Sequence, residues 1–274
     1  AMTDIAGTIL DAQRNDGPAA KAAGQYTTRF LRDAALGEVA AAKAAGKALF
    51  LYAAWNAIHY DVAIPDAHAL GQPVYMKAVG LGLPQERALA LAALRIVDAA
   101  NEWIYSRLDR DNTIWIQTSD NGGEPHKGAS NYPLRGGKGS GWQGGSQVPC
   151  FMWLGANLRG SLKSYEGLVH VTDWVPTLIG GALGAPEALP DDLYGQDLWE
   201  SLRGNSEKKR EDILLLATAG TGDDAGEAMI SLRTDRYKVL IGQAPCAVGT
   251  PSSGYAGCDC SVDRTTVWVS DLLE

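Results

Sequence analysis

Two short apolar segments, each preceded by a helical pattern, constrain the fold of this chain most. The Ala-rich stretch 27–45, followed by Gly46, is typical of a helix that ends at a glycine. Directly after it, 47–53 is apolar without polar alternation, which predicts a parallel strand buried on both faces. A second helix is predicted over about 84–108, and a second strand follows at 113–118. Alternating helices and two-sided strands indicate an α/β sheet covered by helices on both faces.

The pattern of the sequence changes after about residue 205. Upstream of this point, a further strand is predicted at 148–154 and a helix at 170–183. Downstream there are short strand-like runs separated by turn residues, at 213–217, 228–232, 237–241 and 266–270. We therefore predict an α/β domain over 1–204 and a small antiparallel β subdomain over 205–274.

The charge and hydropathy of the chain exclude two classes of partner. With a formal net charge of −8, most of the surface would repel a nucleic acid or an anionic membrane. The longest apolar runs, 48–55 and 212–219, are too short to span a bilayer. An anionic substrate must then be held by a local cluster of positive side chains.

Three of the four cysteines gather near the end of the chain. Cys246, Cys258 and Cys260 lie in a segment rich in Gly, Pro and Ser, so we expect one disulfide among them, with its pairing left open. We expect the fourth, Cys150, to be a buried thiol. A zinc site is disfavoured because no histidine lies near the cluster and Cys-Asp-Cys is not a structural zinc spacing.

Polar residues follow the first two predicted strands, where ligands bind in open α/β sheets. His59 comes after the first strand, and Asp120 and Asn121 come directly after the second. Carboxylate and amide oxygens are ligands suited to Ca²⁺ or Mg²⁺, and the two glycines that follow allow a sharp turn. Asp-Asn-Gly-Gly is also an ordinary turn sequence, so a purely structural role stays open. The glycine-rich loop that continues to Gly145 is long enough to be functional.

Four short motifs follow one another over about 60 residues. They are TSDNGG at 118–123, NYPLRGGK at 131–138, WQGGSQVP at 142–149 and HVTDWVPTL at 170–178. In this order they resemble the sulfatase family, nearest its arylsulfatase B-like (N-acetylgalactosamine-4-sulfatase-like) branch. The resemblance implies part of the mixed α/β sheet of the alkaline phosphatase and sulfatase fold, with a small C-terminal antiparallel sheet. It also implies hydrolysis of sulfate esters on aryl or glycan substrates.

The resemblance assigns roles residue by residue. It places Asp120 and Asn121 on a metal ion, normally Ca²⁺, and directs Lys138 and His59 to the sulfate or its leaving oxygen. A Lys ammonium and a His donor would stabilise the negative charge that develops on that oxygen. Arg135 is a further candidate contact to the substrate. We expect Asp120, Asn121, His59 and Lys138 to converge in one pocket.

The nucleophile that this family needs is not found. In sulfatases it is a formylglycine made from the Cys or Ser of a Cys/Ser-x-Pro/Ala-x-Arg motif, and no such motif precedes His59. The metal site is also incomplete, because Asp120 and Asn121 give about three oxygens whereas Ca²⁺ takes about 6–8. We therefore expect weak metal binding by this chain.

Three functional interpretations stay open. The first is a sulfuric ester hydrolase represented by its C-terminal half, either as a truncated chain or as a chain that acts with a separate N-terminal half. The second is a non-catalytic module that binds a sulfated or phosphorylated ligand through Lys138, Arg135 and His59. The third is a metal-dependent esterase or phosphoesterase that uses water as its nucleophile.

The resemblance also bears on location and assembly. It implies a secreted, periplasmic or lysosomal protein, although the first residues, AMTDIAGTIL, lack the basic and apolar regions of a signal peptide. Strands without their neighbours expose an apolar edge, which favours self-association. We expect a homodimer, or poor solubility that the missing half corrects.

Overall fold

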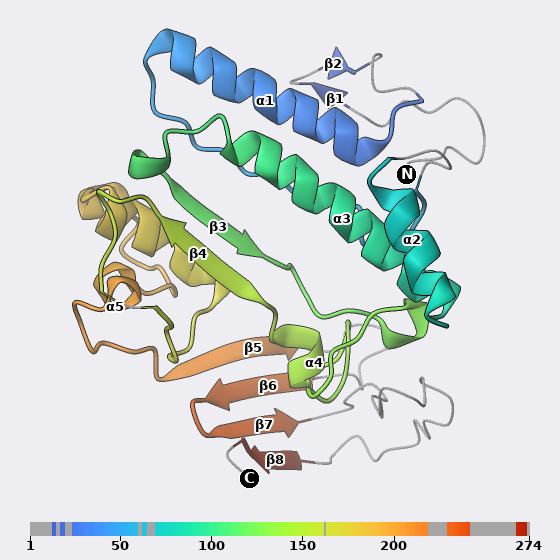
Figure 1. Cartoon of the computed structure of the whole chain (residues 1–274). Helices are drawn as coiled ribbons and strands as arrows, with labels where there is room; N and C mark the ends of the chain where they lie inside the picture. Colours follow the sequence, from blue (N-terminus) through green and yellow to red (C-terminus); the bar gives the residue numbers. More distant parts are fainter. Residues whose placement is uncertain are drawn as a thin grey trace. The chain divides into compact units, whose positions relative to one another are not determined.

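The structure is a computed structural model that describes residues 13–14, 17–19, 24–59, 62–64, 69–161, 163–218, 229–241 and 267–272 (Figure 1). The chain divides into two compact units. The first comprises 1–110 and 124–130, and the second comprises 111–123 and 131–274. Within the described residues, no helix combines the length and apolar character that crossing a membrane requires.

The first unit is built mainly from three helices, α1 Thr27–Ala45, α2 Gly71–Gly80 and α3 Gln85–Tyr105. The helices predicted at 27–45 and 84–108 are confirmed, whereas α2 was not predicted. α1 ends where Gly46 adopts a φ of 62°, a left-handed conformation that glycine takes without strain. Two very short strands, β1 Gln13–Arg14 and β2 Gly17–Pro18, pair antiparallel before α1.

Small side chains on α3 form most of the interface between these helices. α1 and α2 both pack on α3 (Figure 1). The buried side chains of α3 are Ala88, Ala92, Ala93, Ile96, Val97, Ala99, Ala100 and Ile104. Alanines let helices approach closely, and Gly71 of α2 shows how closely, because a Cβ there would lie 3.0 Å from the Cδ1 atom of Ile96.

The parallel strand predicted at 47–53 is wrong. This segment has no regular secondary structure, and Phe50 and Tyr52 within it are each 83% exposed. A strand that is apolar on both faces needs hydrogen-bonding neighbours and covering layers. No strand of the described part of the chain pairs with 47–53, so its apolar side chains stay on the surface of the first unit.

The second unit begins with a pair of antiparallel strands, β3 Ile114–Thr118 and β4 Cys150–Leu154. Their register sets Ile116 opposite Met152 and Thr118 opposite Cys150. Both strands were predicted. The predicted range for β4, 148–154, begins two residues before the observed strand. The prediction of a buried thiol at Cys150 is wrong: the residue is exposed, although partial burial of the sulfur raises the pKa of the thiol.

A four-stranded antiparallel sheet follows in the second unit, in the order β5-β6-β7-β8. Its strands are β5 Asp212–Thr218, β6 Met229–Thr234, β7 Tyr237–Ile241 and β8 Val267–Asp271. The small C-terminal antiparallel sheet is therefore confirmed. The expected disulfide among Cys246, Cys258 and Cys260 lies outside the described residues, and the domain boundary at 205 stays a prediction.

Between β4 and β5 in the sequence, the region predicted as a helix at 170–183 is helical but irregular. A 3₁₀ turn, η4 Val171–Asp173, leads into a π-helix, η5 Pro176–Ala182, and the short helix α5 Trp199–Arg203 packs against it. A Cβ at Gly181 would lie 2.3 Å from the Cβ of Trp199, so η5 and α5 meet at this glycine. The remaining short elements are η2 Arg110–Asn112, η3 Pro125–Lys127, α4 Gln143–Ser146 and η6 Pro186–Ala188.

A buried ion pair fixes the start of this helical region. Asp173 and Arg210 are 0% and 1% exposed at their side chains, and Arg210 Nη1 donates to Asp173 Oδ1 at 2.6 Å. The same carboxylate accepts the backbone N–H groups of His170 at 2.7 Å and Gln196 at 2.9 Å. Asp173 thus joins three segments of the second unit, which makes the pair well satisfied in spite of its burial.

Candidate functional site

The turn that carries Asp120 and Asn121 directly follows β3 and is held by its neighbours. Ser119 Oγ donates to the carbonyl oxygen of Asn121 at 2.9 Å, and the N–H of Gly122 donates to the carbonyl oxygen of Gly145 at 2.9 Å. A Cβ at Gly122 would lie 1.7 Å from a backbone oxygen, that of Gly144. Glycine is therefore required at 122 by the close approach of another backbone segment.

Asn131 clamps this turn to the segment that contains Lys138. Its side-chain oxygen accepts the N–H of Gly123 at 2.9 Å, while Nδ2 donates to the carbonyl oxygens of Gly123 at 2.8 Å and Gly136 at 3.1 Å. The backbone N–H of Lys138 also donates to the carbonyl oxygen of Gly123, at 3.2 Å. The structure thus brings the backbone of Lys138 to within two residues of Asn121.

A third stretch closes the loop network around Trp142. The N–H of Gly144 donates to the carbonyl oxygen of Arg135 at 2.6 Å, and the Arg135 guanidinium lies 3.9 Å from the centre of the Trp142 ring. Stacking of this kind holds a cation over an aromatic face. A Cβ at Gly144 would lie 2.2 Å from the carbonyl oxygen of Gly136, so this approach also requires glycine. Three of the four sequence motifs therefore form one connected framework.

The predicted site residues belong to both units. Asp120, Asn121, Arg135 and Lys138 are in the second unit, on the loop network just described, with Asp120 and Arg135 exposed and the other two partly buried. His59 is exposed in the first unit. Its convergence with the other four residues stays a prediction.

The residues present supply only part of a divalent metal site. Nowhere in the described residues do three or more His, Cys, Asp or Glu side chains gather as metal ligands would. The carboxylate of Asp120 and the amide of Asn121 offer about three oxygens, fewer than the roughly 6–8 that Ca²⁺ takes. We therefore assign no chemical step to a metal ion.

Side chains of the C-terminal sheet form hydrogen bonds to the glycine-rich loop. These contacts were not predicted from the sequence. The segment 141–147 accepts three hydrogen bonds from β6 and β7. They run from Ser231 Oγ to the Gly141 oxygen at 3.1 Å, from Arg233 Nη1 to Gln147 Oε1 at 2.7 Å, and from Lys238 Nζ to Ser146 Oγ at 3.4 Å. The available signal was strand alternation, which puts Ser231 and Arg233 on one face of β6.

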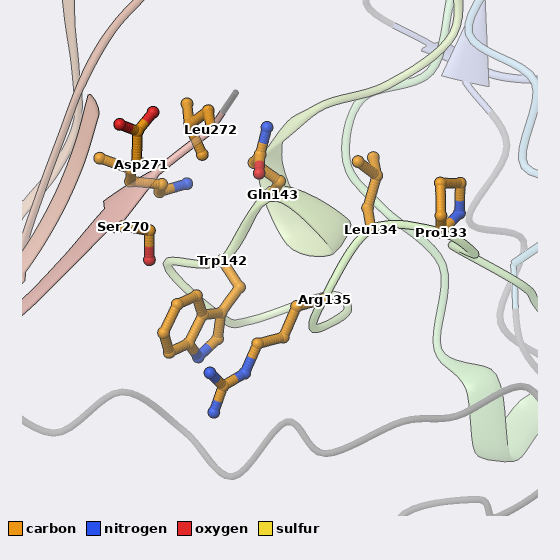
Figure 2. A pocket seen from close by; sticks show the side chains of 9 residues that line it. Pro133, Leu134, Arg135, Trp142, Gln143, Ser270, Asp271 and Leu272 are labelled. Atoms are coloured by element: carbon orange, nitrogen blue, oxygen red, sulfur yellow. The ribbon is translucent and has the colours of Figure 1, made fainter. Parts of the chain in front are cut away.

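A pocket of about 270 Å³ lies between the loop and the ends of β7 and β8 in the second unit. Figure 2 shows the loop side chains, among them Arg135 and Trp142, on one side and those of β8 on the other. Its lining comprises Pro133, Leu134, Arg135, Trp142, Gln143, Lys238, Ser270, Asp271 and Leu272. Burial and, to a smaller extent, the nearby Arg233 charge lower the pKa of Lys238 to about 8.

Comparison with known sequences gives the class of protein. The sequence model described as Sulfatase matches residues 4–185. Arylsulfatase J of Mus musculus is 35% identical over 174 residues, which are 61% of this chain and 27% of that protein. The uncharacterized sulfatase YdeN of Escherichia coli (strain K12) is 31% identical over 179 residues, 61% of this chain and 29% of that protein.

Solved structures agree with the sequence comparison. Ps i-CgsB, crystallised in complex with k-i-k-neocarrahexaose, has a TM-score of 0.64 and 26% identity over 82% of this chain and 48% of its own. The PsFucS1 sulfatase from Pseudoalteromonas sp. has a TM-score of 0.60 and 22% identity over 90% and 46%, and so shows the fold alone. The predicted α/β fold of alkaline phosphatase and sulfatase type is confirmed.

The fold and the motifs of the glycine-rich loop thus agree on a scaffold of the sulfatase type. The chain belongs to the sulfatase family. It spans less than a third of the curated relatives that it matches, and about half of the solved chains.

Proposed function

We propose that this chain supplies the sulfate-binding part of a sulfate ester hydrolase site, with Lys138 as the contact to the sulfate or its leaving oxygen. The observation that carries the proposal is that Gly123 forms hydrogen bonds with two other residues of the loop. Asn131 and the backbone of Lys138 both bond to this glycine, which lies two residues after Asn121 and three after Asp120. A rigid loop positions a charged group better than a mobile one does, because less ordering remains to be done when the substrate binds.

The chemistry of the reaction suits these side chains. Hydrolysis of a sulfate ester breaks the bond between sulfur and the leaving oxygen, adds the hydroxyl of water to sulfur and gives a proton to the leaving oxygen. The Lys138 ammonium and a donor nitrogen of His59 would stabilise the charge that develops there. The nucleophile is assigned to no residue of this chain, because the formylglycine motif does not occur before His59.

The substrate class and the metal belong to the same proposal. A relative described as an arylsulfatase and a neighbour solved with a neocarrahexaose support an aryl or glycan sulfate as the substrate. Asp120 and Asn121 would contribute part of a Ca²⁺ or Mg²⁺ site that needs further oxygen ligands. A secreted, periplasmic or lysosomal location fits such substrates.

Calorimetric titration of the full chain with a nitrophenyl sulfate tests the proposal. Lys138→Ala should weaken binding by about tenfold, since a hydrogen bond to a charged group contributes about 1.5–3 kcal/mol. The matched control is Lys163→Ala, which removes an exposed lysine of the second unit outside the loop. Equal affinity of the wild type and Lys138→Ala would refute the assignment of Lys138. Metal-dependent turnover by the chain alone would instead favour an esterase that uses water.

A further inference from the structure

Two cations lie side by side on the face of the C-terminal sheet that meets the loop. Arg233 is directly opposite Lys238 across β6 and β7, and Lys238 is directly opposite Ser270 across β7 and β8. Residues in such pairs put their side chains on the same face of an antiparallel sheet. The three residues therefore form a row across three strands, and Lys238, in the middle, is only 2% exposed.

Neither cation has a carboxylate partner among the described residues. The Lys238 ammonium donates to a hydroxyl, that of Ser146, and the Arg233 guanidinium donates to the amide oxygen of Gln147. The Nε atom of Arg233 is buried without a hydrogen-bond partner in the structure. Two adjacent cations in a desolvated position repel each other, and an anion placed beside them would relieve that repulsion.

The pocket at the end of β7 and β8 gives an anion access to this row. Lys238 and Ser270 line it, and the stacked guanidinium of Arg135 lies on the loop side (Figure 2). One carboxylate, that of Asp271, also lines the pocket. It is neutralised by Arg236, whose Nε and Nη2 atoms donate to Asp271 Oδ2 at 3.0 and 2.8 Å.

We propose that this pocket binds a sulfate group of a sulfated saccharide substrate, between Lys238 and Arg135. The inference rests on the proposed function, and it adds a second anion subsite to the one assigned to Lys138. A pocket of about 270 Å³ suits a substituent of a larger ligand better than a whole oligosaccharide. Gln143 and Ser270 offer neutral donors to the same group.

The indole N–H signal of Trp142, which lines the pocket, gives a local readout by NMR. It is followed while a monosulfated hexosamine is added to the full chain, with unsulfated hexosamine and inorganic sulfate in parallel. We expect the sulfated sugar to shift the Trp142 signal at concentrations where the other two do not. A response to inorganic sulfate as strong as that to the sulfated sugar would overturn the proposal in favour of a site for free oxyanions.

Two variants identify the cations involved. Lys238→Met and Arg135→Gln should each raise the concentration needed for half-maximal shift by about tenfold, while Lys163→Met leaves it unchanged. Arg135 is exposed, so its replacement provides a test even where Lys238→Met perturbs the sheet. Unchanged midpoints in both variants would overturn the proposal.

The same titration of Lys138→Ala separates this inference from the proposed function. A normal Trp142 response in Lys138→Ala, together with weakened calorimetric binding of the nitrophenyl sulfate, supports two separate subsites. A Trp142 response that is lost in Lys138→Ala but intact in Lys238→Met would refute the second subsite and leave the proposed function standing.

The pH dependence supplies a last check. The charged groups around Lys238 are Arg233, directly opposite it on β6, and Arg135, which lines the same pocket from the loop. Asp271 of β8 also lines the pocket and is paired with Arg236. Because the pKa of Lys238 is about 8, sugar affinity should fall as the pH rises above that value, and Lys238→Met should abolish the fall. A pH dependence that persists in Lys238→Met would contradict the role of this lysine.

Discussion

Asp173 shows how a single residue organises the second unit. Its buried carboxylate accepts hydrogen bonds from Arg210, His170 and Gln196. Arg210 also stacks on Tyr194, 4.4 Å from the ring centre, and the His170 ring meets the edge of the same tyrosine. Burial and the nearby Arg210 charge lower the pKa of His170, whereas the Asp173 carboxylate acts in the opposite direction.

Replacing Asp173 with Ala should destabilise the chain strongly, since it leaves the Arg210 guanidinium buried without a counter-charge. We expect a loss of about 3–5 kcal/mol in the free energy of unfolding, measured by urea titration. The control is Arg236→Ala, which breaks the more exposed pair with Asp271 and should cost less than about 1 kcal/mol. Similar losses in the two variants would contradict the structural role of Asp173.

Local sequence patterns predicted those helices and strands whose signals lie within the element or directly beside it. Gly46 marked the end of α1, and the strand alternation at 237–241 predicted β7. The error at 47–53 arose because an apolar run reports the tendency to be buried, whereas a strand also needs partners that the sequence of the run does not contain. The pattern there was correct about hydrophobicity and wrong about pairing.

The candidate site was predictable only in part, because its residues are brought together by contacts between segments that are distant in the sequence. Asp120, Asn121 and Lys138 stood in recognisable motifs, but their mutual placement depends on the two-way bond of Asn131 to Gly123. The contribution of Lys238, in a strand about 100 residues after Lys138, had no local signal beyond strand alternation. Contacts between distant segments are set by packing, which a periodicity does not encode.

Strand β7 carries a pH-dependent contribution to stability. The folded pKa of Lys238 is about 8, below its usual 10.5, so the unfolded chain binds more protons between these values. The free energy of unfolding should therefore rise with pH across this window, relative to Lys238→Met. Urea titrations of both proteins at several pH values test this, and parallel curves would show that Lys238 keeps its ordinary pKa.

Several aromatic side chains are exposed in the described part of both units. In the first unit Phe50 and Tyr52 are each 83% exposed, and in the second unit Phe151 and Trp153 are 59% and 44% exposed. Exposed aromatic groups of this kind mark surfaces that another chain covers. We propose that the chain self-associates through the segment 47–53.

Sedimentation velocity at increasing concentration checks this prediction. We expect a dimer in the wild type that Phe50→Ser with Tyr52→Ser weakens markedly, since both side chains lie outside the packed core. Matched substitution of Met76, also exposed but on α2, should have a smaller effect. A monomer at every concentration would exclude self-association.

We propose that the turn at Asp120 and the side chain of Lys138 belong to one ligand site. The most direct test adds Mn²⁺ to the full chain and follows the paramagnetic broadening of its NMR signals, which falls steeply with distance from the ion. We predict selective broadening of the Lys138 amide, abolished in Asp120→Ala. Broadening that spares Lys138, or that persists in Asp120→Ala, would contradict a shared ligand site.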